Sequence, residues 1–140
     1  MKRLETTRTN DLGELMFCAL YNLHSYWIAG NVEPVTASRI KKNTGLELKG
    51  YRIVLYSEGL SHLLNRHYSE PGKKQRGVKY KDIGRIGNVV NRYNTVEYSK
   101  RTDRLVFKRR FPDGTLSLVV EIDHANKVLS GITLWIRIDG

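Results

Sequence analysis

The sequence predicts an α+β domain in which N-terminal helices pack on one face of a curved, mainly antiparallel sheet of four to five strands. Two observations lead to this prediction. Apolar residues recur at three- and four-residue steps early in the chain, which is the spacing of an amphipathic helix. The last third consists of β-rich runs joined by short turns, which favour antiparallel pairing. Helices followed by a strand meander are typical of an α+β domain.

The elements expected before residue 92 are mainly helical. An N-cap at Asn10 or Asp11 and the apolar spacing after it predict a helix over residues 12–27, ended by Gly30. Thr36 can cap a short helix that stops near residue 43. Further elements are a strand at 49–56, a helix at 58–67 capped by Ser57, and a weaker helix at 81–91.

The last third is expected to be strands throughout. Pro112-Asp113-Gly114 and His124-Ala125-Asn126 have turn chemistry. The strands predicted around these turns cover residues 95–99, 104–111, 115–123 and 127–138.

At 140 residues the chain is expected to form one compact unit, with residues 1–33 as a helical extension of a main domain over 34–140. The lone Cys18 excludes an internal disulfide and fits a reducing cytoplasm. No apolar run reaches membrane-spanning length and no signal-peptide pattern is present, so we expect a cytoplasmic protein without a membrane partner.

The positive charge is concentrated in one third of the chain. Residues 66–110 hold 14 Lys and Arg against 4 Asp and Glu, whereas the rest holds 10 of each. Such a surface attracts nucleic acid, although an anionic membrane or an acidic protein would also satisfy it. Within it, Lys73, Lys74 and Arg76 form a basic loop that would hold phosphates without reading bases.

His62 and His67 stand just before this basic region. On a helical wheel His67 falls in the apolar arc, and His62 falls on the opposite side. Their five-residue spacing does not suit a helical metal pair, so no metal site is expected. Both can titrate near neutral pH and serve as acid or base. Periodicity alone favours a structural His67 at the helix end beside the core, and the corresponding interpretation of His62 is a solvated surface residue.

Alternation in the predicted sheet places polar side chains on one face. Lys108 and Arg110 lie opposite the apolar residues of their strand, and Thr133, Trp135 and Arg137 lie opposite those of the last strand. A solvated face is the commoner explanation of such alternation. The same chemistry suits RNA cleavage, because cations neutralise phosphate, an aromatic ring stacks on a base and a hydroxyl binds a nonbridging oxygen.

The order TGLELKGYRIVLYSEGLSHLLNRH, a loop, VKYKDIGRIGNVVNRYNTVEYS, and then RLVFKRRF, LSLVVEI and GITLWI resembles the phage-associated barnase–EndoU–colicin–RelE-like nucleases over residues 44–138. The resemblance implies helices on a four-stranded antiparallel sheet and metal-independent RNA cleavage on its open face. It matches His62 and His67 to the helix-end histidines, one of Lys108–Arg110 to a basic strand residue, and Thr133 to the hydroxyl of the last strand. The sequence His67-Tyr68, where the family has His-Gly, and the basic loop are departures.

The sequence therefore predicts a metal-independent ribonuclease from a phage or toxin system, with RNA (tRNA included) as substrate and an immunity or host protein as a further partner. No cofactor is expected. The alternative is a non-catalytic phage protein that binds nucleic acid or blocks an acidic host protein. The predicted catalytic residues are His62, His67, Lys108, Arg110 and Thr133. The predicted nucleic-acid-binding residues are Lys73, Lys74, Arg76, Arg109, Trp135 and Arg137.

Overall fold

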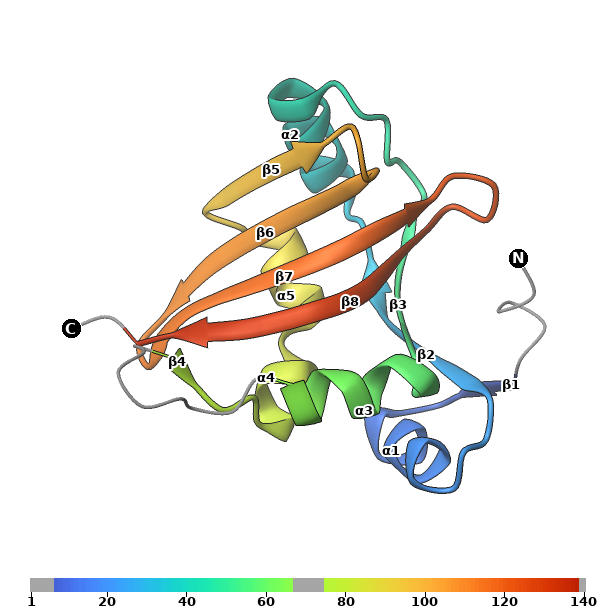
Figure 1. The fold of residues 1–140 in the computed structure, drawn as a ribbon. Coiled ribbons are helices and arrows are strands. Elements are labelled where there is room, and N and C mark those ends of the chain that lie inside the picture. Colours follow the sequence, from blue (N-terminus) through green and yellow to red (C-terminus); the bar gives the residue numbers. More distant parts are fainter. Residues whose placement is uncertain (1–6, 67–74, 139–140) are drawn as a thin grey trace.

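The computed structural model describes residues 7–66 and 75–138 and contains one mixed sheet with short helices (Figure 1). The strand order is β1-β2-β3-β8-β7-β6-β5, and β4 also pairs with β8. The strands are β1 (Thr7–Thr9), β2 (Ser25–Asn31), β3 (Arg52–Tyr56), β4 (Gln75–Arg76), β5 (Thr95–Ser99), β6 (Arg104–Phe111), β7 (Gly114–Asp123) and β8 (Val128–Arg137). The helices are α1 (Leu12–Leu20), α2 (Pro34–Thr44), α3 (Ser57–Arg66), α4 (Tyr80–Gly84) and α5 (Ile86–Asn91).

The prediction of a four- to five-stranded, mainly antiparallel sheet is wrong, although the class is α+β. Over the described residues the sheet has eight strands and is mixed, because β1 pairs with β2 and β3 pairs with β8 in parallel. The β3–β8 pairing spans three residues on each strand. Parallel neighbours are far apart in the sequence, and no local turn signals their pairing.

The predicted helix over residues 12–27 is the second error. The helix α1 ends at Leu20, and Asn22 adopts a left-handed conformation with φ 55°. The chain then forms β2, in which Tyr26 and Trp27 pair with Tyr56 and Leu55 of β3. Aromatic residues favour strands when cross-strand partners are present. Pairing with β3 therefore overrides a helical spacing that continues into the strand.

The four strands predicted in the last third are confirmed, with every end within one residue of its predicted position. They form an antiparallel meander, β5-β6-β7-β8. A register shift between Val119 and Val120 marks a bulge against β8. The turn between β6 and β7 is anchored to α4, since Asp113 accepts hydrogen bonds from Lys81 (3.1 Å) and Arg85 (3.2 Å).

In Figure 1 α5 lies behind the meander, α2 lies beside β5, and α3 lies below β8; the core fills the space between these helices and the sheet. The sheet contributes Leu105, Phe107, Leu118 and Leu134 to this core, and α5 contributes Val89, each of them fully buried. The opposite side of β5–β8, which we call the open face, has no helix among the described residues packed over it.

The other predicted helices are confirmed with adjustments. The N-cap of α2 is Glu33 and Pro34 occupies the first turn, so Thr36 is not the cap. Gly45 ends α2 with φ 82°, a conformation that glycine adopts without strain. The weak helix at 81–91 is two helices that meet at Arg85. Among the described residues no helix is long and apolar enough to cross a membrane.

Candidate nucleic-acid interface

The open face carries two neighbouring rows of polar side chains near one end of the meander. Cross-strand pairing places Arg110 (β6), Thr115 (β7) and Arg137 (β8) in the first row. We call this the cationic row. Strands lie about 4.8 Å apart, so the two arginine Cα atoms are separated by roughly 10 Å. Both arginines are exposed.

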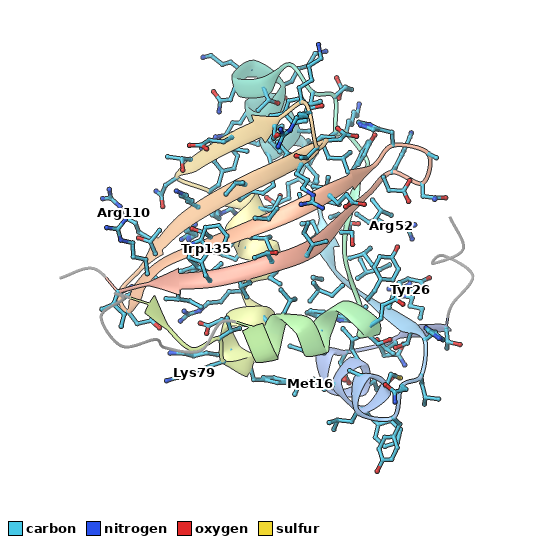
Figure 2. The ribbon with its side chains drawn as sticks, viewed as in Figure 1. Met16, Tyr26, Arg52, Lys79, Arg110 and Trp135 are labelled. Carbon is cyan, nitrogen blue, oxygen red and sulfur yellow. The ribbon has the colours of Figure 1, made fainter. Side chains whose placement is uncertain are left out.

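The second row lies two residues from the first on each strand and contains Lys108, Ser117 and Trp135. We call this the aromatic row; it lies about 7 Å from the cationic row. Ser117 is 2% exposed between its two larger neighbours, whereas Lys108 and Trp135 are half-buried. Figure 2 shows Trp135 and Arg110 at the same end of the sheet, with Arg52 at the other end. An aromatic ring thus lies beside cations on one surface.

Thr133 lies one further repeat along, opposite Val119, with Val106 completing the row on β6. It is half-buried and shares the open face with Trp135. The Val119/Val120 bulge begins directly after this row. Beyond it, Arg104 pairs with Glu121 at 3.5 Å, so this farther part of the face holds a compensated charge pair. The uncompensated cations of β6–β8 therefore concentrate in the cationic and aromatic rows.

No carboxylate of the described residues forms an ion pair with Lys108, Arg110 or Arg137. The attraction of such cations for an anion is not offset by a neighbouring carboxylate. An anion bound between two of them has a more favourable electrostatic energy than an anion bound to one cation. The surface is therefore suited to a polyanion whose charges repeat along a chain.

Arg109 differs from its neighbours because alternation turns its side chain to the helix side. It donates from Nη1 to the carbonyl oxygen of Arg92 at 2.9 Å, and its guanidinium lies 5.3 Å from the centre of the Phe111 ring. Its Nε is buried without a hydrogen-bond partner. Arg109 thus supports the β6 strand from the core side, and it does not share a face with Lys108 and Arg110.

The two predicted acid–base residues are His62 and His67. His62 lies in α3, which packs through Leu60 and Leu63 against the core, and its side chain is not described. His67, Lys73 and Lys74 lie outside the described residues. Arg76 is in β4 opposite Ile136, and Gln75 is opposite Arg137. The chain thus re-enters the described structure, after the segment that carries His67, beside the cationic row.

A second polar cluster, which sequence reasoning missed, lies at the other end of the meander. His124 Nε2 is 2.9 Å from Asp103 Oδ2, and its Nδ1 is 3.2 Å from the hydroxyl of Tyr51. Tyr98 donates to Asp103 Oδ1 at 2.9 Å. The cluster joins the β5–β6 turn, the β7–β8 turn and the start of β3. Both ring nitrogens of His124 have partners, so the cluster holds the two turns together. We call it the turn cluster.

The two tyrosines of the turn cluster, Tyr51 and Tyr98, predict a loss of stability at alkaline pH. The hydrogen bond to Asp103 raises the pKa of Tyr98, and burial, aided by the charges of Asp103 and Asp123, raises the pKa of Tyr51. A raised folded-state pKa stabilises the protein below the unfolded value of about 10. That contribution is lost as pH rises through the folded-state values.

Urea unfolding from neutral pH to about pH 11 measures this effect. The double variant Tyr51→Phe/Tyr98→Phe should be less stable at neutral pH and should lose less stability on alkalinisation. An unchanged alkaline slope in the double variant would show that other groups cause the loss.

The fold is that of a small α+β protein whose open face carries cations, hydroxyls and an aromatic ring. A family model described as phage-Barnase-EndoU-ColicinE5/D-RelE like nuclease3 matches residues 30–139, so the chain belongs to this family of phage nuclease-like proteins. The predicted resemblance is confirmed, and the match begins 14 residues earlier than the resemblance did. Comparisons with curated proteins and with solved structures gave no match.

Proposed function

We propose that the protein is a metal-independent ribonuclease that binds RNA across the open face of β6–β8. Membership of a nuclease-like family supports cleavage of a nucleic acid in general. The observation that carries the finer proposal is the pairing Lys108–Ser117–Trp135 next to Arg110–Thr115–Arg137. These two rows combine what an RNA strand needs, namely charge for the backbone and a stacking surface for a base.

In this proposal the two arginines of the cationic row hold the backbone, and Lys108 neutralises charge that develops on the reacting phosphate. Preorganised cations stabilise a transition state because their orientation costs nothing at the moment of reaction. Trp135 stacks on a base, which contributes about 1–3 kcal/mol in single-strand binders. Thr133 donates its hydroxyl hydrogen to a nonbridging oxygen.

RNA is proposed in preference to DNA because its 2′-hydroxyl supplies an internal nucleophile. A base removes the 2′-hydroxyl proton, the oxygen attacks the adjacent phosphorus, and the 5′-oxygen leaves with a proton from an acid. The products are a cyclic phosphate and a free 5′-hydroxyl. His67, with His62 as its partner, keeps the acid–base role on sequence grounds; such catalysis contributes about 10²–10⁴-fold.

End-labelled RNA incubated with protein in EDTA tests the proposal, beside DNA of the same sequence. Wild type should cut RNA to cyclic-phosphate ends and leave DNA intact. His67→Ala should abolish cutting with binding retained. Lys108→Ala should slow cutting by about 10²-fold, as the loss of one charge-stabilising donor does. The matched control Lys42→Ala, an exposed lysine on α2, should behave as wild type.

The outcomes separate the competing functions. Cutting of DNA, or cutting that requires added metal, would contradict the proposed chemistry while leaving a nuclease. Salt-sensitive RNA binding without cutting by wild type would favour the non-catalytic binder. We further propose a phage or toxin setting in the host cytoplasm, which membership of a phage nuclease-like family supports in its phage part. The proposed protein partner is an acidic immunity or host protein, which the cationic row would attract.

A further inference from the structure

The open face continues beyond β8 onto β3 and β2. Val54 of β3 is paired with Ser130 of β8, and Ser130 is paired with Glu121 on the open face. Paired residues of neighbouring strands lie on the same face of a sheet, and every second residue of a strand returns to that face. Val54 and Tyr56 therefore lie on the open side, and so does Tyr26 of β2, which is paired with Tyr56.

The burial pattern of β3 agrees with this assignment. Ile53 and Leu55, which alternate with the residues of the open side, belong to the main core between the helices and the sheet. A second, separate cluster is formed by three buried residues, Val54, Tyr56 and Val128. Tyr26 is partly buried and packs against this second cluster. The open side of β2 and β3 therefore has an apolar floor, with the ring of Tyr26 at its border.

A row of one cation and two aromatic residues crosses this part of the sheet. Cross-strand pairing places Arg8 (β1), Tyr26 (β2) and Tyr56 (β3) side by side. We call this the tyrosine row. The ring centres of the two tyrosines are 6.2 Å apart, and Arg8 is exposed. The tyrosine row thus repeats the combination of a cation and an aromatic ring that Lys108 and Trp135 form in the aromatic row.

A second cation lies on the same side of β3. Arg52 precedes Tyr56 by four residues, so alternation places both on the open side, and Arg52 is half-buried. Figure 2 shows Arg52 and Tyr26 at the same end of the sheet, away from Trp135. No carboxylate within residues 7–66 and 75–138 forms an ion pair with Arg8 or Arg52. Their attraction for a phosphate group is therefore not offset by a neighbouring carboxylate.

The tyrosine row and the aromatic row are far enough apart to take separate bases. On the register of β3 against β8, three residues along β8 and two strand spacings separate Trp135 from Tyr26, which gives roughly 15 Å between their Cα atoms. Neighbouring nucleotides of a stacked strand are about 3.4 Å apart. Two bases bound at Trp135 and Tyr26 would therefore be several nucleotides apart on one strand.

We propose that the tyrosine row is a second base-binding subsite for the same RNA strand. The ring of Tyr26 stacks on a base several nucleotides from the base on Trp135, and Arg8 and Arg52 hold the phosphates beside it. Arg8 and Tyr26 precede the residues that match the nuclease family, so the subsite extends the RNA contact to residues before that match. The inference rests on the proposed binding of RNA to the open face.

The affinities of a long and a short RNA for the full chain test the proposal. The long probe is a single-stranded 2′-O-methyl RNA of about twelve nucleotides, and the short probe has about three, too few to reach both rings. Neither probe is cut by attack of a 2′-hydroxyl, because the methyl group blocks it. Tyr26→Leu should weaken binding of the long RNA about tenfold, which is the loss of one stacked base, and leave the short RNA unaffected. Trp135→Ala should weaken both, and Arg8→Ala should lower the salt slope of the long RNA by about 0.7.

Two further variants control for folding and for the loss of any tyrosine. Tyr26→Phe keeps the ring and should bind the long RNA as wild type does, and circular dichroism checks that Tyr26→Leu is folded. The matched control Tyr21→Leu makes the same replacement at the C-terminal end of α1, where Tyr21 is 64% exposed, and should also bind as wild type.

The outcomes distinguish the subsite from the proposed function. Long-RNA binding that is weakened by Trp135→Ala and unchanged in Tyr26→Leu would overturn the subsite and leave RNA binding on the open face. An equal loss for both RNA lengths in Tyr26→Leu would show that Tyr26 only supports the sheet, which also overturns the subsite. A wild-type protein that binds neither RNA would overturn the proposed function and the subsite together.

Discussion

Replacing Lys108, Arg110 and Arg137 together by alanine should weaken the binding of single-stranded RNA and flatten its salt dependence. Each phosphate neutralised on a single strand contributes about 0.7 to the slope of log affinity against log salt. Three contacts on two adjacent rows therefore predict a slope smaller by about 2 in the triple variant. The electrostatic contribution of the three side chains is largest at low salt. The affinities of wild type and the triple variant should therefore differ most at low salt and converge as salt is raised. Fluorescence anisotropy of a labelled single-stranded RNA over a salt series measures both quantities.

The matched control for this triple variant is Lys42→Ala/Lys49→Ala/Lys100→Ala. It removes the same charge from exposed positions on α2, in the segment before β3 and in the β5–β6 turn. If binding depended only on net charge, the two triple variants would lose equal affinity, and the open face would not be the binding surface. A local interface predicts a control slope close to that of wild type. Folding is not at issue in either variant, since every replaced side chain is exposed or half-buried.

The polar rows were predictable because they follow from local rules. Short turns make β5–β8 an antiparallel meander, and alternation then sorts each strand into two faces. Lys108 and Trp135 fall on one face by this rule, as the structure confirms. The same rule separates Arg109 from Lys108, so its place on the helix side was available from the sequence. Lys108, Arg109 and Arg110 were grouped by charge alone, and this grouping ignored the face of the sheet on which each side chain lies.

The features that were not predicted from the sequence depend on contacts between residues that are far apart in the chain. Tyr26 and Trp27 satisfy both a helical spacing and a strand, and only their pairing with Tyr56 and Leu55 decides between the two. The parallel pairing of β3 with β8 has no local signature at all. Asp103 and His124 are likewise joined by the arrangement of two hairpin turns, with nothing in their spacing to indicate it.

Phe107→Ala should cost about 3–5 kcal/mol of unfolding free energy, the usual loss for a buried phenylalanine. Phe107 is fully buried on β6, its ring centre is 5.6 Å from that of Tyr93, and it lies between two open-face residues, Val106 and Lys108. The midpoint of thermal unfolding should fall by roughly 10–17 °C. Thermal and urea unfolding followed by circular dichroism measure both values.

The matched control is the neighbouring Val106→Ala, which shortens a half-buried side chain on the open face. It should cost about 1 kcal/mol or less, because little apolar area is removed from contact. Equal losses in the two variants would contradict the placement of the core on the helix side. RNA affinity provides the complementary test. Well below its unfolding midpoint, Phe107→Ala should still bind RNA, because Lys108 and the cationic row lie on the other face. Two neighbouring residues of β6 therefore have separate effects. Replacing Phe107 lowers stability, whereas replacing Lys108 lowers RNA binding.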